Sequence, residues 1–325
     1  MPLSAEPVAK PIVIAHRGAS GERPEHTLAS YERAIALGAD FVEPDLVMTR
    51  DGVLVARHEN EISGTTDVAA RPEFAHRKTT KSIDGEAVTG WFTEDFTLAE
   101  LKTLRARERL PKLRPQNTVY DGQFEIPTLQ EIIDLVRANE TAAGRRIGLY
   151  PETKHPGYFQ GIGLAMERPL VAMLEKNGYS HAGDPVFIQS FEAENLKELR
   201  GLTKLRLIQL MGAEPHFAAM TTPEGLKSVA TYADGVGPAK ALIVPVSKLG
   251  KREAPTRFVA DAHAAGLKVH AWTFRVENYF LPADMRKGLN PRGRGDMAAE
   301  IRLFVELGVD GVFSDNPGEA LAALE

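Results

Sequence analysis

Eight short apolar segments recur along the chain, and helical patterns separate most of them. Strands that alternate with helices are typical of repeated βα units, because parallel strands need a crossover connection. A small residue and an aspartate precede several segments, as LGAD precedes FVEPD. This pattern predicts an α/β fold, a (β/α)8 TIM barrel, with a doubly wound open sheet as the alternative. The predicted strands are 12–16, 41–48, 147–153, 185–191, 205–211, 233–237, 268–274 and 310–315, and helical patterns cover 25–38, 128–140 and 257–266.

One stretch does not fit the repeat. Segment 49–127 is polar and much longer than a usual βα connection, so we expect an insertion after the second strand, over the carboxyl-terminal face of the barrel. A hairpin is predicted at Asp51-Gly52. Segment 275–295, rich in glycine and arginine, is predicted to be a long surface loop. Because no low-complexity linker divides the chain, residues 1–325 are expected to form a single catalytic domain.

Composition favours small-molecule chemistry. The 39 Lys and Arg residues against 44 Asp and Glu give a net charge of −5, so no basic patch for nucleic acid is visible. The absence of cysteine excludes thiol nucleophiles, thiolate metal sites and disulfides. No apolar run reaches the ~20 residues of a membrane span, and residues 1–11 lack the apolar region of a signal peptide. We therefore expect a cytoplasmic protein, or one whose cleaved leader is absent from this sequence.

Carboxylates stand in the second and third predicted strands. Glu43 and Asp45 are two residues apart, so on a strand they share one face, about 6.6 Å apart along the backbone. Glu152 stands near the end of the third strand. Three carboxylates without thiolates suit a hard divalent cation, Ca²⁺ or Mg²⁺. A salt-bridged or capping pair is the alternative, but burying two like charges without a cation is costly.

Histidines and basic residues stand near the same strand ends. His16 ends the first strand and precedes Arg17, whereas His58 follows the predicted hairpin. Two imidazoles can act as acid and base on either side of a reacting centre. Arg17 and Lys154 can hold phosphoryl oxygens. Taken alone, each basic residue is more often part of a surface ion pair, and a lone His58 is more often a surface or core residue.

Later strands add further candidates. Gln189 and Trp272 stand near strand ends and are expected to contact a substrate, although a core position has about equal weight for Trp272. The remaining histidines, which include His26, His155 and His270, have no comparable partners along the sequence. These histidines are interpreted as structural or surface residues.

Taken together, these motifs resemble the glycerophosphodiester phosphodiesterase family. The resemblance covers nearly the whole chain in order, and such a compound pattern is specific. The middle of the chain looks most like the bacterial periplasmic branch of the family. The motifs are HRG at 16–18, PEHT at 24–27, EPD at 43–45, TRDGVLVARHE at 49–59, PETK at 151–154 and WTF at 272–274.

The resemblance implies metal-dependent hydrolysis of small glycerophosphodiesters, such as glycerophosphocholine and glycerophosphoethanolamine, to glycerol 3-phosphate and an alcohol. It implies Ca²⁺ as the cofactor, with Mg²⁺ as the alternative, and a periplasmic location, with the cytoplasm as the alternative. Attack by water and attack by the 2-hydroxyl of the substrate both stay open. The implied roles are general base and acid for His16 and His58, metal binding for Glu43, Asp45 and Glu152, and phosphate binding for Arg17 and Lys154.

Two residues depart from the usual family pattern. His26 stands where many members have asparagine, and Glu59 follows the second histidine where aspartate is usual. The second departure puts in doubt a contact to His58 or to the metal.

Two other functions stay open. A barrel that only binds, with structural Ca²⁺, would need no pair of proton-transfer histidines. A phospholipase D-type enzyme that cleaves lysolipids or sphingolipids would need an apolar groove for acyl chains. The insertion offers only four large aromatic residues for such a groove: Phe74, Trp91, Phe92 and Phe96.

Overall fold

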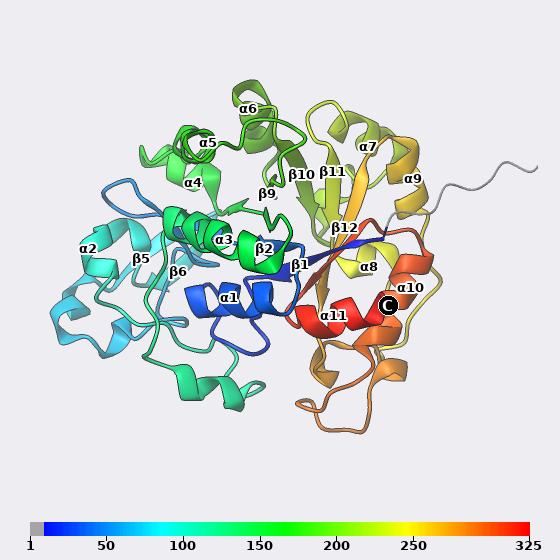
Figure 1. Ribbon diagram of the computed structural model, residues 1–325, viewed down its shortest axis with the longest axis horizontal. Coiled ribbons are helices and arrows are strands. Elements are labelled where there is room, and N and C mark those ends of the chain that lie inside the picture. Colours follow the sequence, from blue (N-terminus) through cyan, green and yellow to red (C-terminus); the bar gives the residue numbers. More distant parts are fainter. Residues whose placement is uncertain (1–9) are drawn as a thin grey trace, which may run out of the picture.

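A closed ring of parallel strands surrounded by helices forms the centre of the molecule in this computed structural model, which describes residues 10–325 (Figure 1). Each of the eight predicted strands pairs in parallel with the next, and the last pairs with the first. The predicted (β/α)8 barrel is therefore confirmed, and the open sheet is wrong. The ring consists of β1 Ile12–His16, β2 Phe41–Glu43, β3 Asp45–Met48, β7 Gly148–Leu149, β8 Glu152–Thr153, β9 Phe187–Ser190, β10 Arg206–Met211, β11 Gly235–Pro238, β12 Lys268–Phe274 and β13 Gly311–Ser314.

Two predicted strands are interrupted. Segment 41–48 divides at Pro44 into β2 and β3, and segment 147–153 divides into β7 and β8 beside Pro151. Proline has no amide hydrogen to donate to the neighbouring strand, so a ladder breaks at that residue. The pairing resumes beyond the break, where the Glu152 amide donates to the Pro44 carbonyl at 2.9 Å. The carboxylates on both segments therefore stay at one level of the barrel.

Helices cover the outside of the ring (Figure 1). All three predicted helical patterns are helices, although α1 begins only at Leu28. Thr27 sets that start, because its side chain accepts a hydrogen bond from the Ser30 amide at 3.1 Å and so caps the helix. The helices that follow the strands are α1 Leu28–Ala36, α3 Leu129–Ala143, α4 Pro156–Gly161, α5 Glu167–Lys176, α6 Ala193–Leu202, α7 Pro223–Val229, α8 Lys240–Ile243, α9 Phe258–Ala264, α10 Met297–Glu306 and α11 Pro317–Ala323.

Segment 49–127 lies between β3 and α3 and has secondary structure of its own. The Asp51-Gly52 turn reverses the chain, and β4 Leu54–Ala56 pairs antiparallel with β3. A second hairpin, β5 Thr79–Ile83 with β6 Glu86–Gly90, and helix α2 Leu98–Leu101 follow. This chain reversal brings His58 back toward the barrel strands. Short 3₁₀ helices occupy Val68–Ala70, Pro72–Arg77, Thr93–Asp95 and Pro115–Tyr120 here, and Pro215–Phe217, Asn278–Phe280 and Ala283–Met285 later.

A separate apolar cluster contains residues of several barrel strands. His270 lies among it, only 2% exposed, and its Nδ1 is 2.7 Å from the Tyr150 hydroxyl. Burial lowers the pKa of His270 to about 4. The cluster consists of Ile14, Phe41, Tyr150, Phe187, Ile208 and Phe313.

The buried His270 predicts a pH-dependent stability. Between pH 6.5 and about 4 the unfolded chain binds a proton at this ring and the folded chain does not, so stability falls as the pH falls through this window. The shift corresponds to about 3 kcal/mol. Urea unfolding at pH 7 and pH 4.5 should show a smaller pH dependence for His270→Gln than for the wild type. The matched change of an exposed histidine, His181→Gln, should leave the pH dependence unchanged.

Two expectations from the sequence concern the amino-terminal segment and membrane-spanning helices. Residues 1–9, which carry most of the segment used for the leader prediction, lie outside the described residues. Within residues 10–325, no helix is both long and apolar enough to cross a bilayer.

Candidate active site

The strand register brings the predicted carboxylates to one level of the barrel. His16 at the end of β1 lies opposite Glu43 at the end of β2. Asp45 lies opposite Glu152, which in turn lies opposite Gln189 on β9. The carboxyl ends of parallel strands meet at one face of a barrel, which is where barrel enzymes build their sites.

Glu43, Asp45 and Glu152 form a buried cluster. Each side chain offers an oxygen within 4.8 Å of an oxygen of the other two, and none is more than 4% exposed. One of these oxygens, Asp45 Oδ1, is buried without a hydrogen-bond donor, whereas Glu152 Oε1 is paired with the Lys154 ammonium at 2.8 Å. Buried carboxylate oxygens that lack donors suit a cation better than a hydrogen-bond network.

The charges around the cluster explain its pKa values. Burial and the charges of Asp45 and Glu152 raise the pKa of Glu43 well above its usual range. Burial also raises the pKa of Glu152 to about 7, although Lys154 opposes this shift. The pKa of Asp45 moves the other way, because Lys154, His26 and Arg17 outweigh its burial. Without a cation, simultaneous ionisation of all three carboxylates is therefore unfavourable.

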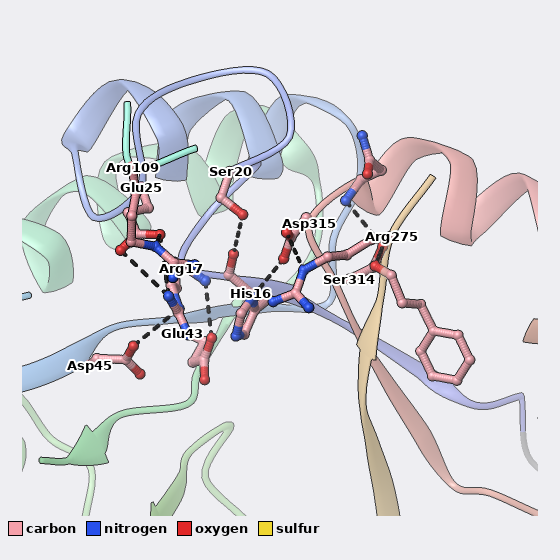
Figure 2. A network of polar contacts seen from close by, with 12 residues as sticks. His16, Arg17, Ser20, Glu25, Glu43, Asp45, Arg109, Arg275, Ser314 and Asp315 are labelled. Atoms are coloured by element: carbon pink, nitrogen blue, oxygen red, sulfur yellow. Dashed lines mark hydrogen bonds and ion pairs between the residues drawn. The ribbon is translucent and has the colours of Figure 1, made fainter. Parts of the chain in front are cut away.

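Arg17 lies beside the cluster and is held from three sides (Figure 2). Its amide donates to Glu43 Oε2 at 3.0 Å, and its guanidinium lies 3.2 Å from Glu25 and 3.3 Å from Asp45. Arg109 of the insertion pairs with the same Glu25 at 2.8 Å. Although burial opposes it, the charges of Glu25 and Asp45 raise the pKa of Arg17 above its usual range. Arg17 is therefore a fixed positive charge at the cluster.

The next residue lets the chain pass close to helix α1. Gly18 has a φ of +84°, and a Cβ there would lie 2.7 Å from the Ser30 backbone carbon. Only glycine meets both the conformation and the close approach without strain. The glycine of the HRG motif thus fixes the position from which Arg17 reaches the carboxylates.

His16 is oriented by a carboxylate from the far end of the chain. Its Nδ1 lies 2.6 Å from Asp315 Oδ1, and Arg275 binds Asp315 at 2.7 Å (Figure 2). Arg114 binds the same carboxylate at 2.6 Å. The two arginines overcome the effect of burial and hold the pKa of Asp315 well below its usual range. Burial, with the nearby Arg17 charge, lowers the pKa of His16 to about 3. A neutral His16 that donates from Nδ1 to Asp315 has Nε2 available as a base.

His58 enters from the insertion and has a different partner. Its Nδ1 lies 2.8 Å from Glu59 Oε1, and Glu59 Oε2 lies 2.8 Å from Nε2 of His155. The other ring nitrogen of His155, Nδ1, lies 2.5 Å from Asp84, so a series of hydrogen bonds links His58 to Asp84. Burial, together with the charges of Arg17 and Lys154, lowers the pKa of His58 to about 3. Glu59, which departs from the usual aspartate, thus contacts His58 in this structure.

His26 is a buried structural residue, which is one of the two alternatives that the sequence interpretation gave. It is fully buried, with Nε2 3.0 Å from Asp45 Oδ2 and Nδ1 2.7 Å from the Tyr31 hydroxyl. Burial lowers the pKa of His26, so the neutral ring donates from Nε2 to Asp45 and accepts from Tyr31. His26 therefore orients one oxygen of Asp45 and leaves Oδ1 without a donor. His155 and His270 also have defined partners, which residue spacing did not indicate.

The three remaining predicted residues, Lys154, Gln189 and Trp272, also have defined partners. Lys154 Nζ lies 2.8 Å from Glu152, and the Gln189 amide donates to Glu43 at 2.8 Å. Trp272 is partly exposed, and its indole N–H donates to the Gly237 carbonyl at 2.7 Å. These bonds hold both predicted substrate-contacting residues, Gln189 and Trp272, in fixed positions.

A cavity of about 340 Å³ connects these groups. Eight of the nine predicted site residues line it, and Asp45 lies behind them, 1% exposed. Phe191 and Arg275, which the sequence interpretation omitted, also line the cavity. The predicted residues in its wall are His16, Arg17, Glu43, His58, Glu152, Lys154, Gln189 and Trp272.

The fold and this site define a barrel enzyme, with titratable groups, fixed cations and a candidate cation site around one cavity at the carboxyl ends of the strands. The chain belongs to the glycerophosphoryl diester phosphodiesterase family, whose sequence profile matches residues 16–319. The family resemblance and the enzyme class expected from the sequence are therefore confirmed.

Relatives of this family occur in plants and bacteria. A glycerophosphodiester phosphodiesterase of Arabidopsis thaliana is 38% identical over 95% of this chain and 85% of its own length. A glycerophosphodiester phosphodiesterase of Haemophilus influenzae is 32% identical over 82% of this chain and 79% of its own length. Because similarity extends to a plant enzyme, the bacterial periplasmic branch and the periplasmic location stay predictions.

Solved structures share the fold. One from Silicibacter pomeroyi, described as a glycerophosphoryl diester phosphodiesterase, has a TM-score of 0.68 at 23% identity and covers 96% of this chain and 92% of its own. A phosphodiesterase of Oleispira antarctica, solved with the product sn-glycerol-3-phosphate, has a TM-score of 0.64 at 25% identity. It covers 97% of this chain and 96% of its own.

Proposed function

We propose that this protein hydrolyses small glycerophosphodiesters, such as glycerophosphocholine and glycerophosphoethanolamine, to glycerol 3-phosphate and an alcohol. The carrying observation is the convergence of two neutral histidines, two fixed cations and three carboxylates on one cavity. The bound product of the Oleispira antarctica relative supports the substrate class. General acid–base catalysis by His16 and His58, with a divalent cation, is the mechanism we infer.

The donor set fits a hard divalent cation, Ca²⁺ first and Mg²⁺ second. Glu43, Asp45 and Glu152 would hold the ion, and the Asp45 oxygen without a donor is available to it. Three carboxylates against the charges of Arg17 and Lys154 leave net negative charge, which a divalent ion reverses before an anionic phosphodiester binds. A bound cation would polarise a phosphoryl oxygen and offset the negative charge that develops in the displacement.

His16 is the group we assign as the base. Its Nδ1 is engaged by Asp315, so Nε2 takes the proton of the attacking hydroxyl, from water or from the substrate's 2-hydroxyl. Asp315 then stabilises the imidazolium across the same 2.6 Å contact. Arg114 and Arg275 keep Asp315 ionised for this role.

Arg17 and Lys154 hold the phosphoryl oxygens in this proposal. Both line the cavity, and Glu25 and Glu152 fix their positive ends. An anionic phosphate that neutralises these cations also removes two of the causes that lower the pKa of His58. Substrate binding therefore favours the protonated His58, which donates its proton to the departing alcohol.

The test is release of glycerol 3-phosphate from glycerophosphocholine by the purified protein. We expect a chelator to abolish activity and re-addition of Ca²⁺, or less effectively Mg²⁺, to restore it. Release that persists in excess chelator would contradict the cation requirement alone. Absence of release with any ion would contradict the proposed function, and lysolipids and sphingolipids would then be the next substrates to assay.

A further inference from the structure

A second cavity, of about 310 Å³, adjoins the first and shares four of its residues: Glu152, Lys154, Phe191 and Trp272. A ligand whose phosphate lies between Arg17 and Lys154 can therefore extend into it. The residues that line only the second cavity come from the β5–β6 turn, the segment from β8 into α4, the segment from β9 into α6 and the segment after β10. None of them has a role in the acid–base mechanism.

One side of the second cavity is aromatic. The Phe191 ring contacts Trp272 edge-on, with centroids 5.8 Å apart, and lies 5.9 Å from the Phe217 ring on its other side. All three side chains line the cavity. Aromatic faces attract organic cations through the ring quadrupole and suit a quaternary ammonium group, which offers no hydrogen-bond donor.

Acidic side chains also line the second cavity. Glu192, Glu214 and Asp84 line the same cavity. Asp84 is paired with His155, whereas Glu192 accepts only a backbone hydrogen bond, from the Gly157 amide at 3.0 Å. Within residues 10–325, neither Glu192 nor Glu214 forms an ion pair with a basic side chain.

The basic groups in the walls do not cancel this charge. Lys154 is paired with Glu152, and His155 lies between Glu59 and Asp84. His216 packs against the Phe217 ring, with centroids 4.0 Å apart. Within residues 10–325, Glu192 and Glu214 therefore lie beside three aromatic rings without a basic side chain paired to either.

The hydrogen-bond chain from His58 indicates which end of the substrate reaches this cavity. It runs through Glu59 and His155 to Asp84, which lines the second cavity. Both histidines line the first cavity and neither lines the second, but His58 is linked to the second by this chain, whereas His16 contacts Asp315. The departing alcohol, which His58 protonates, is thus the part of the substrate that faces the second cavity.

We propose that this second cavity binds the ammonium group of the departing alcohol and makes the enzyme selective for glycerophosphodiesters with a cationic head group. The inference rests on the proposed function and names its substrate class. Phe191, Phe217 and Trp272 contact the ammonium methyl or methylene groups, and Glu192 and Glu214 supply the compensating charge.

The test compares two substrates of nearly the same shape. Glycerophosphocholine and the glycerophosphodiester of 3,3-dimethylbutanol differ in the charged nitrogen, which is a neutral carbon in the second compound. We expect the wild type to prefer the choline diester in kcat/KM by on the order of tenfold, the scale of a desolvated cation–π contact. The double change Glu192→Gln and Glu214→Gln should bring the ratio close to one.

The control is Glu224→Gln, an exposed carboxylate outside the cavity, which should keep the wild-type ratio. Phe217→Leu should also lower the ratio, by several fold, and it changes no charge. Equal rates for both diesters in the wild type would overturn the inference while leaving the proposed function intact. An unchanged ratio in the double variant would also overturn it, whereas no glycerol 3-phosphate from either diester would contradict the function itself.

Discussion

His16→Ala is expected to lower kcat for glycerophosphocholine on the order of 10²–10⁴-fold while leaving the cation bound. The reason is geometric, since Asp315 orients the His16 ring through Nδ1 while Nε2 stays available at the cavity. Asp315→Asn should lower kcat as well, because an amide can neither fix the tautomer nor stabilise the imidazolium. KM should change much less than kcat in both variants, which steady-state kinetics with saturating Ca²⁺ will measure.

Two controls separate this role from a structural one. His181→Ala, at an exposed position, should retain the wild-type rate. Calcium binding by His16→Ala, measured by calorimetry, should match the wild type because His16 is outside the carboxylate cluster. A His16→Ala enzyme with wild-type kcat would remove His16 from the mechanism, whatever its metal content.

The sequence predicted the parts of the site that depend on local geometry. Glu43 and Asp45 share a strand face by parity, and the two-residue spacing survives the break at Pro44 because pairing resumes beyond it. Strand ends of a closed barrel meet at one face, which accounts for Glu152 and Gln189. These predictions needed only the period of a strand and the topology of the barrel.

The partners of these residues could not be predicted, because they join distant segments. Asp315 is 299 residues from His16, and its own partner Arg114 comes from the insertion. Asp315 ends the last predicted strand, which was a usable signal, but nothing along the chain indicates which histidine it contacts. The partners of His26 could not be predicted for a similar reason, because only the folded loop turns its ring toward Asp45.

The residues that we propose select the substrate in the second cavity could not be predicted from the sequence either. Glu192 and Glu214 look like ordinary surface carboxylates in the sequence, where charged residues are usually solvated. Only the packing of separate connections around Phe191 places them beside aromatic rings and next to the reaction site. Catalytic residues on the strands are thus easier to predict than the loop residues that select the substrate.

Glu43→Gln is expected to weaken Ca²⁺ binding at least on the order of 100-fold and to lower activity in parallel. The same change should stabilise the protein when the ion is removed. Because the pKa of Glu43 is raised in the folded state, folding binds a proton there, and the ion-free wild type loses stability as the pH rises above the usual glutamate range. Glutamine removes that loss, since it leaves no charge next to Asp45 and Glu152.

The two effects have opposite signs, so one pair of measurements tests the role of Glu43. Melting temperatures in excess chelator at pH 5 and pH 8 should decline with pH in the wild type and decline less in Glu43→Gln. In saturating Ca²⁺ the order should reverse, because the ion stabilises the wild type by mass action and the variant binds it poorly. A variant that binds Ca²⁺ as tightly as the wild type would show that the cluster is not the cation site. A variant destabilised with and without the ion would instead mark Glu43 as a structural residue, held by Gln189 and the Arg17 amide.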